Sequence, residues 1–77
     1  MKPNEKKNIL KQFGGSMKLL RTSKEVTQQE LADKLGISVA YVSLLERGGR
    51  NPPLTTVIEI AKALKGDVRD LVPPVGK

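Results

Sequence analysis

Residues 28–47, QQELADKLGISVAYVSLLER, decide the fold of this 77-residue chain. Apolar residues recur at helical spacing on both sides of Gly36, which predicts two short helices joined by a tight turn. Glycine reaches the left-handed backbone region without the steric cost of a Cβ, so Gly36 can end one helix and redirect the chain. The small Ala32 stands where the first helix approaches the second. The residues expected on the inner sides are Leu31, Leu35, Ile37, Val42 and Leu45.

The ends of both helices carry capping signals. Thr27 precedes the first helix and Glu30 follows three residues later, the spacing of a capping box. Ser38 can cap the second helix, while Arg47 in its last turn and Gly48 beyond it are typical of a C-terminus. We therefore expect helices from about residue 28 and over residues 39–47, which is the arrangement of a DNA-binding helix-turn-helix.

With these and further motifs, the chain resembles the Cro and phage-repressor family of small regulators, often labelled XRE, over residues 13–72. The resemblance implies an all-α, compact five-helix repressor-like domain whose helices two and three form the helix-turn-helix. It also implies an ion pair between Arg21 and Glu46; the alternative is two solvated surface charges. The motifs are MKLLR (17–21), TQQELA (27–32), LGIS (35–38), SLLERG (43–48), RNP (50–52) and IAKAL (60–64).

Length and composition predict one small domain without catalytic function. A chain of 77 residues buries only about 60% of its unfolded surface, which leaves no room for an ordinary catalytic cavity. The sequence contains neither cysteine nor histidine, so we expect no disulfide, no metal site, no cofactor and no assembled nucleophile and base. The sequence has no long apolar run and no export signal, so a cytoplasmic protein without membrane or small-molecule partners is expected.

The positive charge is concentrated at the N-terminus. Of the net +6, all comes from residues 1–24, where seven basic residues face Glu5 alone. We divide the chain into a basic flexible arm (1–7), a DNA-binding domain (8–72) and a short tail (73–77). The basic segment is either an electrostatic tether to phosphate or a solubilising tail.

Three further helices are predicted around the central pair. The first begins near Asn8 and is interrupted by Gly14-Gly15, so that its first turns fray or another helix approaches closely. The fourth spans residues 54–64, starts after Pro53 without a hydroxyl cap, and is closed by Gly66. Asp67 caps a short fifth helix that stops at the prolines 73 and 74.

The outer face of the third helix decides what such a domain reads. Its residues are largely apolar and cannot make the bidentate hydrogen bonds that distinguish bases, but they can pack on thymine methyl groups. We expect a T-rich site with selectivity from DNA shape, or alternatively an apolar strip that docks another protein. The expected base-facing residues are Ser38, Val39, Ala40, Ser43, Leu44 and Arg47.

Contacts to phosphate are expected on both sides of this helix. Gln28 and its helix-terminal amide can clamp one phosphate, and Arg50 and Asn51 can hold the same strand across the groove. Tyr41 adds a hydroxyl contact or simply packs at the helix boundary.

One such domain contacts too little DNA for tight selection, so a homodimer on a pseudo-palindrome is expected, with half-sites about 34 Å apart. The candidate dimer surface is Val68, Leu71, Val72 and the proline-rich tail, although these residues can instead close the core.

Overall fold

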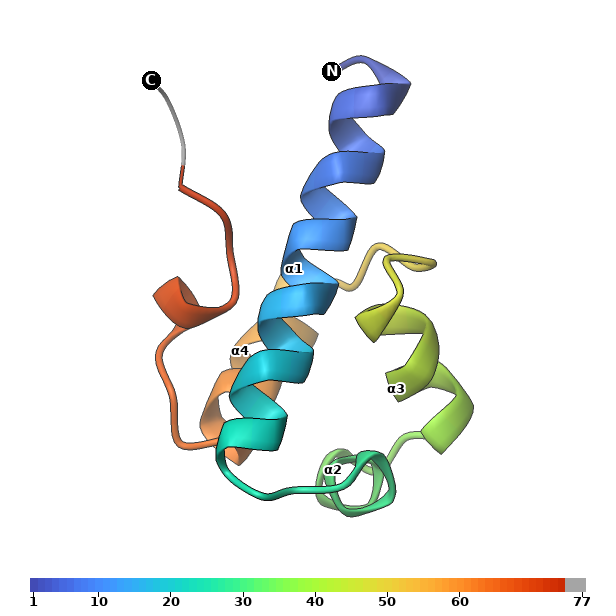
Figure 1. The fold of residues 1–77 in the computed structure, drawn as a ribbon. Coiled ribbons are helices and arrows are strands. Elements are labelled where there is room, and N and C mark those ends of the chain that lie inside the picture. The colour runs from blue at the N-terminus through green and yellow to red at the C-terminus, as the bar shows by residue number, and fades with distance from the viewer. Residues whose placement is uncertain (75–77) are drawn as a thin grey trace.

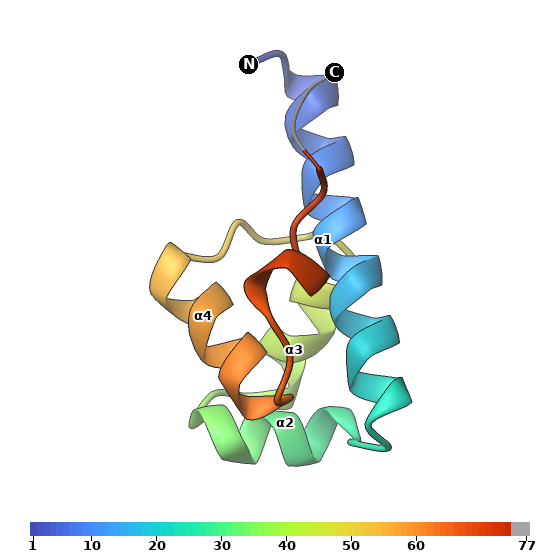
Figure 2. The same ribbon diagram turned by 90° about the vertical axis from the view of Figure 1, so that its left-hand side faces the viewer.

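The computed structural model describes residues 1–74 as a helical domain with extents of 34 × 22 × 20 Å. Within these residues there is no strand. The long α1 projects beyond the other helices at its N-terminal end, and α2 crosses beneath them (Figures 1 and 2). The elements are α1 (Pro3–Ser23), α2 (Gln28–Leu35), α3 (Val39–Glu46), α4 (Leu54–Ala63) and a 3₁₀ turn, η1 (Val68–Asp70).

The predicted start of the first helix is wrong. It begins at Pro3 rather than near Asn8, since proline in a first helical turn is pre-organised and loses no helical hydrogen bond. Residues 3–7, expected as a flexible arm, are therefore the first turns of α1. Gly14 and Gly15 do not interrupt the helix either. The division into arm, domain and tail stays a prediction, and residues 75–77 of the tail lie outside the described part.

Each α-helix of residues 1–74 is followed, within two residues of its end, by a residue with positive φ and by a hydrogen bond that spans six residues. In each bond the donor is the amide directly after the positive-φ residue, and the acceptor is a carbonyl in the last turn of the helix, as in a Schellman motif. The predicted terminator of α4 is wrong by one position, because Lys65 (φ 55°) rather than Gly66 is left-handed. The six-residue bonds are Val26 N to Arg21 O, Ile37 N to Ala32 O, Gly49 N to Leu44 O and Gly66 N to Ala61 O, at 2.8–3.1 Å.

The expected fifth helix is only a three-residue 3₁₀ turn, so the described residues form four α-helices instead of the predicted five. The Asp67 carboxylate does cap it, accepting from the Arg69 amide at 2.8 Å, and Asp70 accepts from the Asp67 amide at 2.8 Å. The turn stays short because too few residues separate Gly66 from the helix-stopping Pro73.

The core lies between α1, α3 and α4 and is closed by α2 below and η1 at the side. α1 packs on α3, α2 packs on both α3 and α4, and η1 packs on α4 and α1. Ala32 is completely buried, as expected where α2 meets its neighbours. The buried apolar residues are Phe13, Met17, Leu31, Ala32, Val42, Leu45, Val57, Ile60, Ala61, Leu64 and Leu71.

Candidate nucleic-acid interface

α3 has a buried side and an open side. Val42, Leu45 and Glu46 face the interior, where the two apolar residues have no exposed surface. On the other side Ala40 and Arg47 are exposed, and Val39 is 40% exposed. Ser43 and Leu44 are half-buried, so the predicted base-facing residues vary in how far they are exposed.

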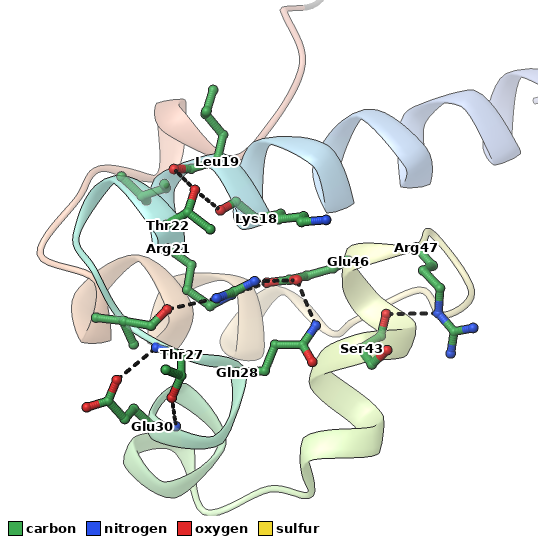
Figure 3. A network of polar contacts seen from close by, with 12 residues as sticks. Lys18, Leu19, Arg21, Thr22, Thr27, Gln28, Glu30, Ser43, Glu46 and Arg47 are labelled. Carbon is green, nitrogen blue, oxygen red and sulfur yellow. Dashed lines mark hydrogen bonds and ion pairs between the residues drawn. The ribbon is translucent and has the colours of Figure 1, made fainter.

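The N-terminus of α3 is fixed by the predicted cap. Ser38 Oγ accepts from the Tyr41 amide at 3.1 Å, which leaves the exposed Ser38 at the tip of the helix. At the other end, the Arg47 Nε donates to the Ser43 carbonyl at 3.3 Å (Figure 3). The helix ends at Glu46, one residue before the predicted end, and Arg47 is its C-cap.

A buried ion pair ties α1 to the end of α3, as the sequence resemblance implies. Arg21 Nε donates to Glu46 Oε2 at 2.6 Å and Nη2 donates to Oε1 at 3.0 Å, with side-chain exposures of 9% and 3%. Arg21 Nη1 also donates to the Val26 carbonyl at 2.8 Å. The hydrogen bonds to Glu46 raise the pKa of Arg21 above its ordinary value, against the opposing effect of burial. Two solvated charges, the alternative interpretation, are excluded.

Gln28 joins this network instead of standing free at the surface. Its Nε2 donates to Glu46 Oε1 at 3.0 Å, so one carboxylate links α1, α2 and α3 (Figure 3). The sequence carried no signal for this contact across 18 residues. As a candidate phosphate ligand Gln28 therefore has its side-chain nitrogen engaged. Of the backbone amides in the first turn of α2, that of Glu30 is capped by Thr27, and the amides before it have no partner within the helix and can bind an anion.

The capping box of α2 forms as predicted. Thr27 Oγ1 accepts from the Glu30 amide at 3.0 Å, and Glu30 Oε1 accepts from the Thr27 amide at 2.8 Å. These bonds lower the pKa of the Glu30 carboxyl below its ordinary value. Gly36 then adopts φ 67° and ends the helix, so the turn between α2 and α3 has its expected chemistry.

Gly14 lets α1 touch the backbone of α3. A Cβ built at this position would lie 2.5 Å from the Leu45 carbonyl oxygen, and the Glu46 carbonyl oxygen is nearer still. Of the two sequence-based interpretations of the glycine pair, close approach is the one the structure supports. Gly15 has nothing within 4 Å of its Cβ position.

The loop after α3 carries the other predicted phosphate contacts. Arg50 and Asn51 are both exposed, and Arg50 Nη1 donates to the neighbouring Gly49 carbonyl at 3.3 Å. Tyr41 is half-buried and packs against the core, which supports its structural role. Gln28, Tyr41, Arg50 and Asn51 therefore differ in how available they are to a ligand.

The predicted dimer surface is only partly available. Leu71 is completely buried and Val68 packs against the core, so both residues close the domain. Val72 is 43% exposed, and it lines an apolar groove with Ile9, Val57 and the prolines at 73 and 74.

Residues 1–74 contain neither a candidate metal-binding cluster nor a helix fit to cross a membrane. None of these residues gathers into a group of three or more histidine, cysteine, aspartate or glutamate side chains placed to hold a metal. Among the described helices, not one combines the length and apolarity needed to cross a membrane.

Comparison with known proteins identifies the family. The family model described as "Helix-turn-helix" matches residues 17–71. An uncharacterised HTH-type transcriptional regulator of Sinorhizobium fredii is 42% identical over 67 residues, which cover 87% of each chain. The control protein C.BamHI of Bacillus amyloliquefaciens is 36% identical over 66 residues, covering 84% of this chain and 82% of the relative.

A solved structure agrees with the sequence comparisons. The restriction-modification controller protein C.AhdI of Aeromonas hydrophila superposes with a TM-score of 0.77 at 39% identity, covering 80% of this chain and 94% of that one. The buried Arg21–Glu46 pair and the capped α2–turn–α3 unit lie within the matched segment. The chain therefore belongs to the helix-turn-helix family of XRE type, the Cro-like transcription regulators.

Proposed function

We propose that this protein is a non-enzymatic repressor that binds specific sequences of double-stranded DNA, with α3 in the major groove. The observation that carries the proposal is the division of α3 into a side fixed by the buried Glu46 and an outer side on which Val39, Ala40 and Arg47 are exposed. An α-helix held rigidly at a domain surface fits the width of the major groove. The membership of this chain in the helix-turn-helix family also supports DNA binding.

Base contacts then come from the open side of α3. Ala40 and Leu44 differ by four positions and lie on one face, where their methyl groups can pack against thymine. Arg47, one turn further along, is the one long cation among the six candidates and can donate to guanine or to phosphate. Ser38, Val39 and Ser43 complete the candidate base-facing set.

Phosphate contacts position the domain and carry no base information. We assign them to the first-turn amides of α2 at Gln28, and to Arg50 and Asn51 in the exposed loop after α3. We propose that these groups hold the DNA backbone on the two sides of the groove that α3 enters.

A homodimer completes the proposal, because one α3 reads only a few base pairs. The apolar groove that Val72 and Pro73 line with Ile9 is the revised candidate contact, since Leu71 is buried. Gel filtration with and without a selected duplex, read for two chains per duplex, tests the stoichiometry.

Selection of bound duplexes from a random pool, at stated salt, tests the function. We expect an enriched pseudo-palindrome with T at contacted positions. Leu44→Ala should lower the preference for T at one position in each half-site by about fourfold. Burying one methyl-sized group against the thymine contributes about 0.8 kcal/mol, and the variant loses this contribution. Leu19→Ala is the matched control, since Leu19 is 72% exposed on α1. No enrichment, or equal effects of both variants, would contradict the proposal.

The second candidate is a protein-docking module that uses the same face. The adjacent exposed Val39 and Ala40 favour it, because contiguous apolar residues on an outer helix face can mark a contact with another protein. In that case the random pool yields no preferred sequence, and NMR titration with oligonucleotides leaves the signals of Val39 and Leu44 unchanged.

A further inference from the structure

Three lysines form a strip along one side of α1. Lys7, Lys11 and Lys18 are spaced four and seven residues apart, and at about 100° per residue they fall within about 40° of each other around the helix axis. The first-turn carboxylate of α1, Glu5, lies on the opposite side of the helix from Lys7. We call Lys7, Lys11 and Lys18 the lysine strip.

The lysine strip borders the end of α3. Gly14, which sits between Lys11 and Lys18 in the chain, faces the Leu45 and Glu46 carbonyls. A Cβ at Gly48 would lie 3.0 Å from the Cα of Lys11, so the loop that leaves α3 rests directly on α1 there. In Figure 3 the Lys18 side chain extends toward the end of α3, on the side where Arg47 is drawn.

The positive charge on this side is uncompensated. Within residues 1–74, none of the three lysines forms an ion pair, since the two salt bridges are Arg21–Glu46 and Arg69–Asp67. The nearest carboxylate at the end of α3, Glu46, is buried and already accepts bonds from Arg21 and Gln28. Arg47 and Arg50 extend the positive surface from α3 into the following loop, where both are exposed.

A rigid helix holds these charges in fixed positions relative to α3, which a flexible tail would not do. Lys7 and Lys11 lie in regular helical turns of α1, so their positions relative to α3 are fixed by the contacts at Gly14 and Gly48. Fixed cations beside a groove-reading helix can contact phosphates and help to fix the register of the domain on a duplex.

We propose that the lysine strip is a second phosphate-binding surface, which contacts the DNA backbone flanking the groove that α3 enters. The proposal rests on the DNA-binding function above and adds a contact from α1. It predicts that the DNA footprint extends beyond the base pairs reached by α3 and the Arg50 loop. The strip adds affinity without changing the preferred sequence, because phosphate contacts carry no base information.

The test compares two triple variants that carry the same charge. K7Q/K11Q/K18Q removes the strip, and K34Q/K62Q/K65Q removes three exposed lysines on α2 and at α4. Each lowers the net charge from +6 to +3, since three lysines become neutral. Binding to one fixed duplex is measured by fluorescence anisotropy between about 50 and 200 mM salt. Thermal unfolding by circular dichroism checks that both variants are folded.

We expect the strip variant to reduce the slope of log K against log salt by about 2 to 3, from about 0.9 for each phosphate contact. The control variant should change it by far less. A slope that stays at the wild-type value, or that falls equally in both variants, overturns the proposal and makes the strip a solubilising surface.

The outcomes also separate this proposal from the function on which it rests. If the wild-type chain selects a sequence and the strip variant keeps the full slope, only the strip fails. If the wild-type chain binds all duplexes alike but loses slope in the strip variant, the proposed sequence specificity fails and the strip stands as a phosphate-binding surface. If it binds no duplex, both are wrong.

Discussion

A methyl group at Gly14 tests how closely α1 is held against α3. The Cβ of Gly14→Ala would lie 2.5 Å from the Leu45 carbonyl oxygen and 2.7 Å from the Glu46 carbonyl carbon. These atoms belong to the backbone, so no side-chain rotation relieves the contact. Because carbon atoms pack at about 3.5–4.0 Å, the two helices must separate by on the order of 1 Å.

The cost follows from two opposing effects. Overpacking of a close contact costs about 1–3 kcal/mol, while alanine gains about 0.5–1 kcal/mol over glycine within a helix. We therefore expect Gly14→Ala to lower the free energy of unfolding by about 1–2 kcal/mol. For a domain of this size the melting temperature falls by about 4–16 °C.

Gly15→Ala is the matched control, because nothing lies within 4 Å of its Cβ position. It changes the same residue type in the same helix, and should raise the free energy of unfolding by about 0.5–1 kcal/mol. Thermal and urea unfolding by circular dichroism measure both variants. A Gly14→Ala protein as stable as Gly15→Ala would refute the close packing of α1 on α3.

Three further predictions concern the ion pair, a helix end and acid stability. Arg21→Ala should cost about 3–5 kcal/mol, because it leaves the buried Glu46 carboxylate without its partner; a double-mutant cycle with Glu46→Ala in urea measures the coupling. Lys65→Gly should raise the free energy of unfolding by up to about 1 kcal/mol, since glycine adopts φ 55° without the Cβ penalty; thermal unfolding measures it. The stabilisation from Glu30, whose pKa is lowered by Thr27 from 4.5, is present above that pH and is lost as the pH falls through the lower folded value. Glu30→Gln should therefore flatten the loss of stability in acid, as followed by urea unfolding at stepped pH.

Each of these has a contrary outcome. Additive effects of Arg21→Ala and Glu46→Ala would mean that the two charges do not interact. A Lys65→Gly protein less stable than wild type would show that the lysine side chain, and not the backbone, governs the end of α4. An unchanged acid limb in Glu30→Gln would remove the capping box from the pH dependence.

The helix-turn-helix was predictable because its signals are local. Thr27, Ser38 and Gly36 act on amides and dihedral angles within a few residues, and each has the expected role in the structure. The Arg21–Glu46 pair was implied only by family resemblance, because two residues 25 apart share no local pattern.

The errors arose where tertiary contacts or backbone geometry overrule composition. From composition, the glycine pair in α1 predicts a break in the helix. In the structure Gly14 is required because the backbone of α3 lies against α1 at this position. Gly66 reads as the end of α4, but Lys65 adopts the left-handed conformation. From the sequence, Gln28 is interpreted as a surface amide. Its hydrogen bond to Glu46 could not be predicted, because it depends on how α2 crosses α3. The base-facing and phosphate residues remain predictions.

The two sides of α3 are under different constraints, so residues on one side can change while those on the other are retained. Val42, Leu45 and Glu46 are constrained by the interior, so exchanging them risks the integrity of the whole molecule. Ala40 and Arg47 contribute nothing to that interior, and their replacement leaves the scaffold intact. A lineage of such chains can therefore diverge in target preference through a handful of outward substitutions while inheriting an unaltered architecture.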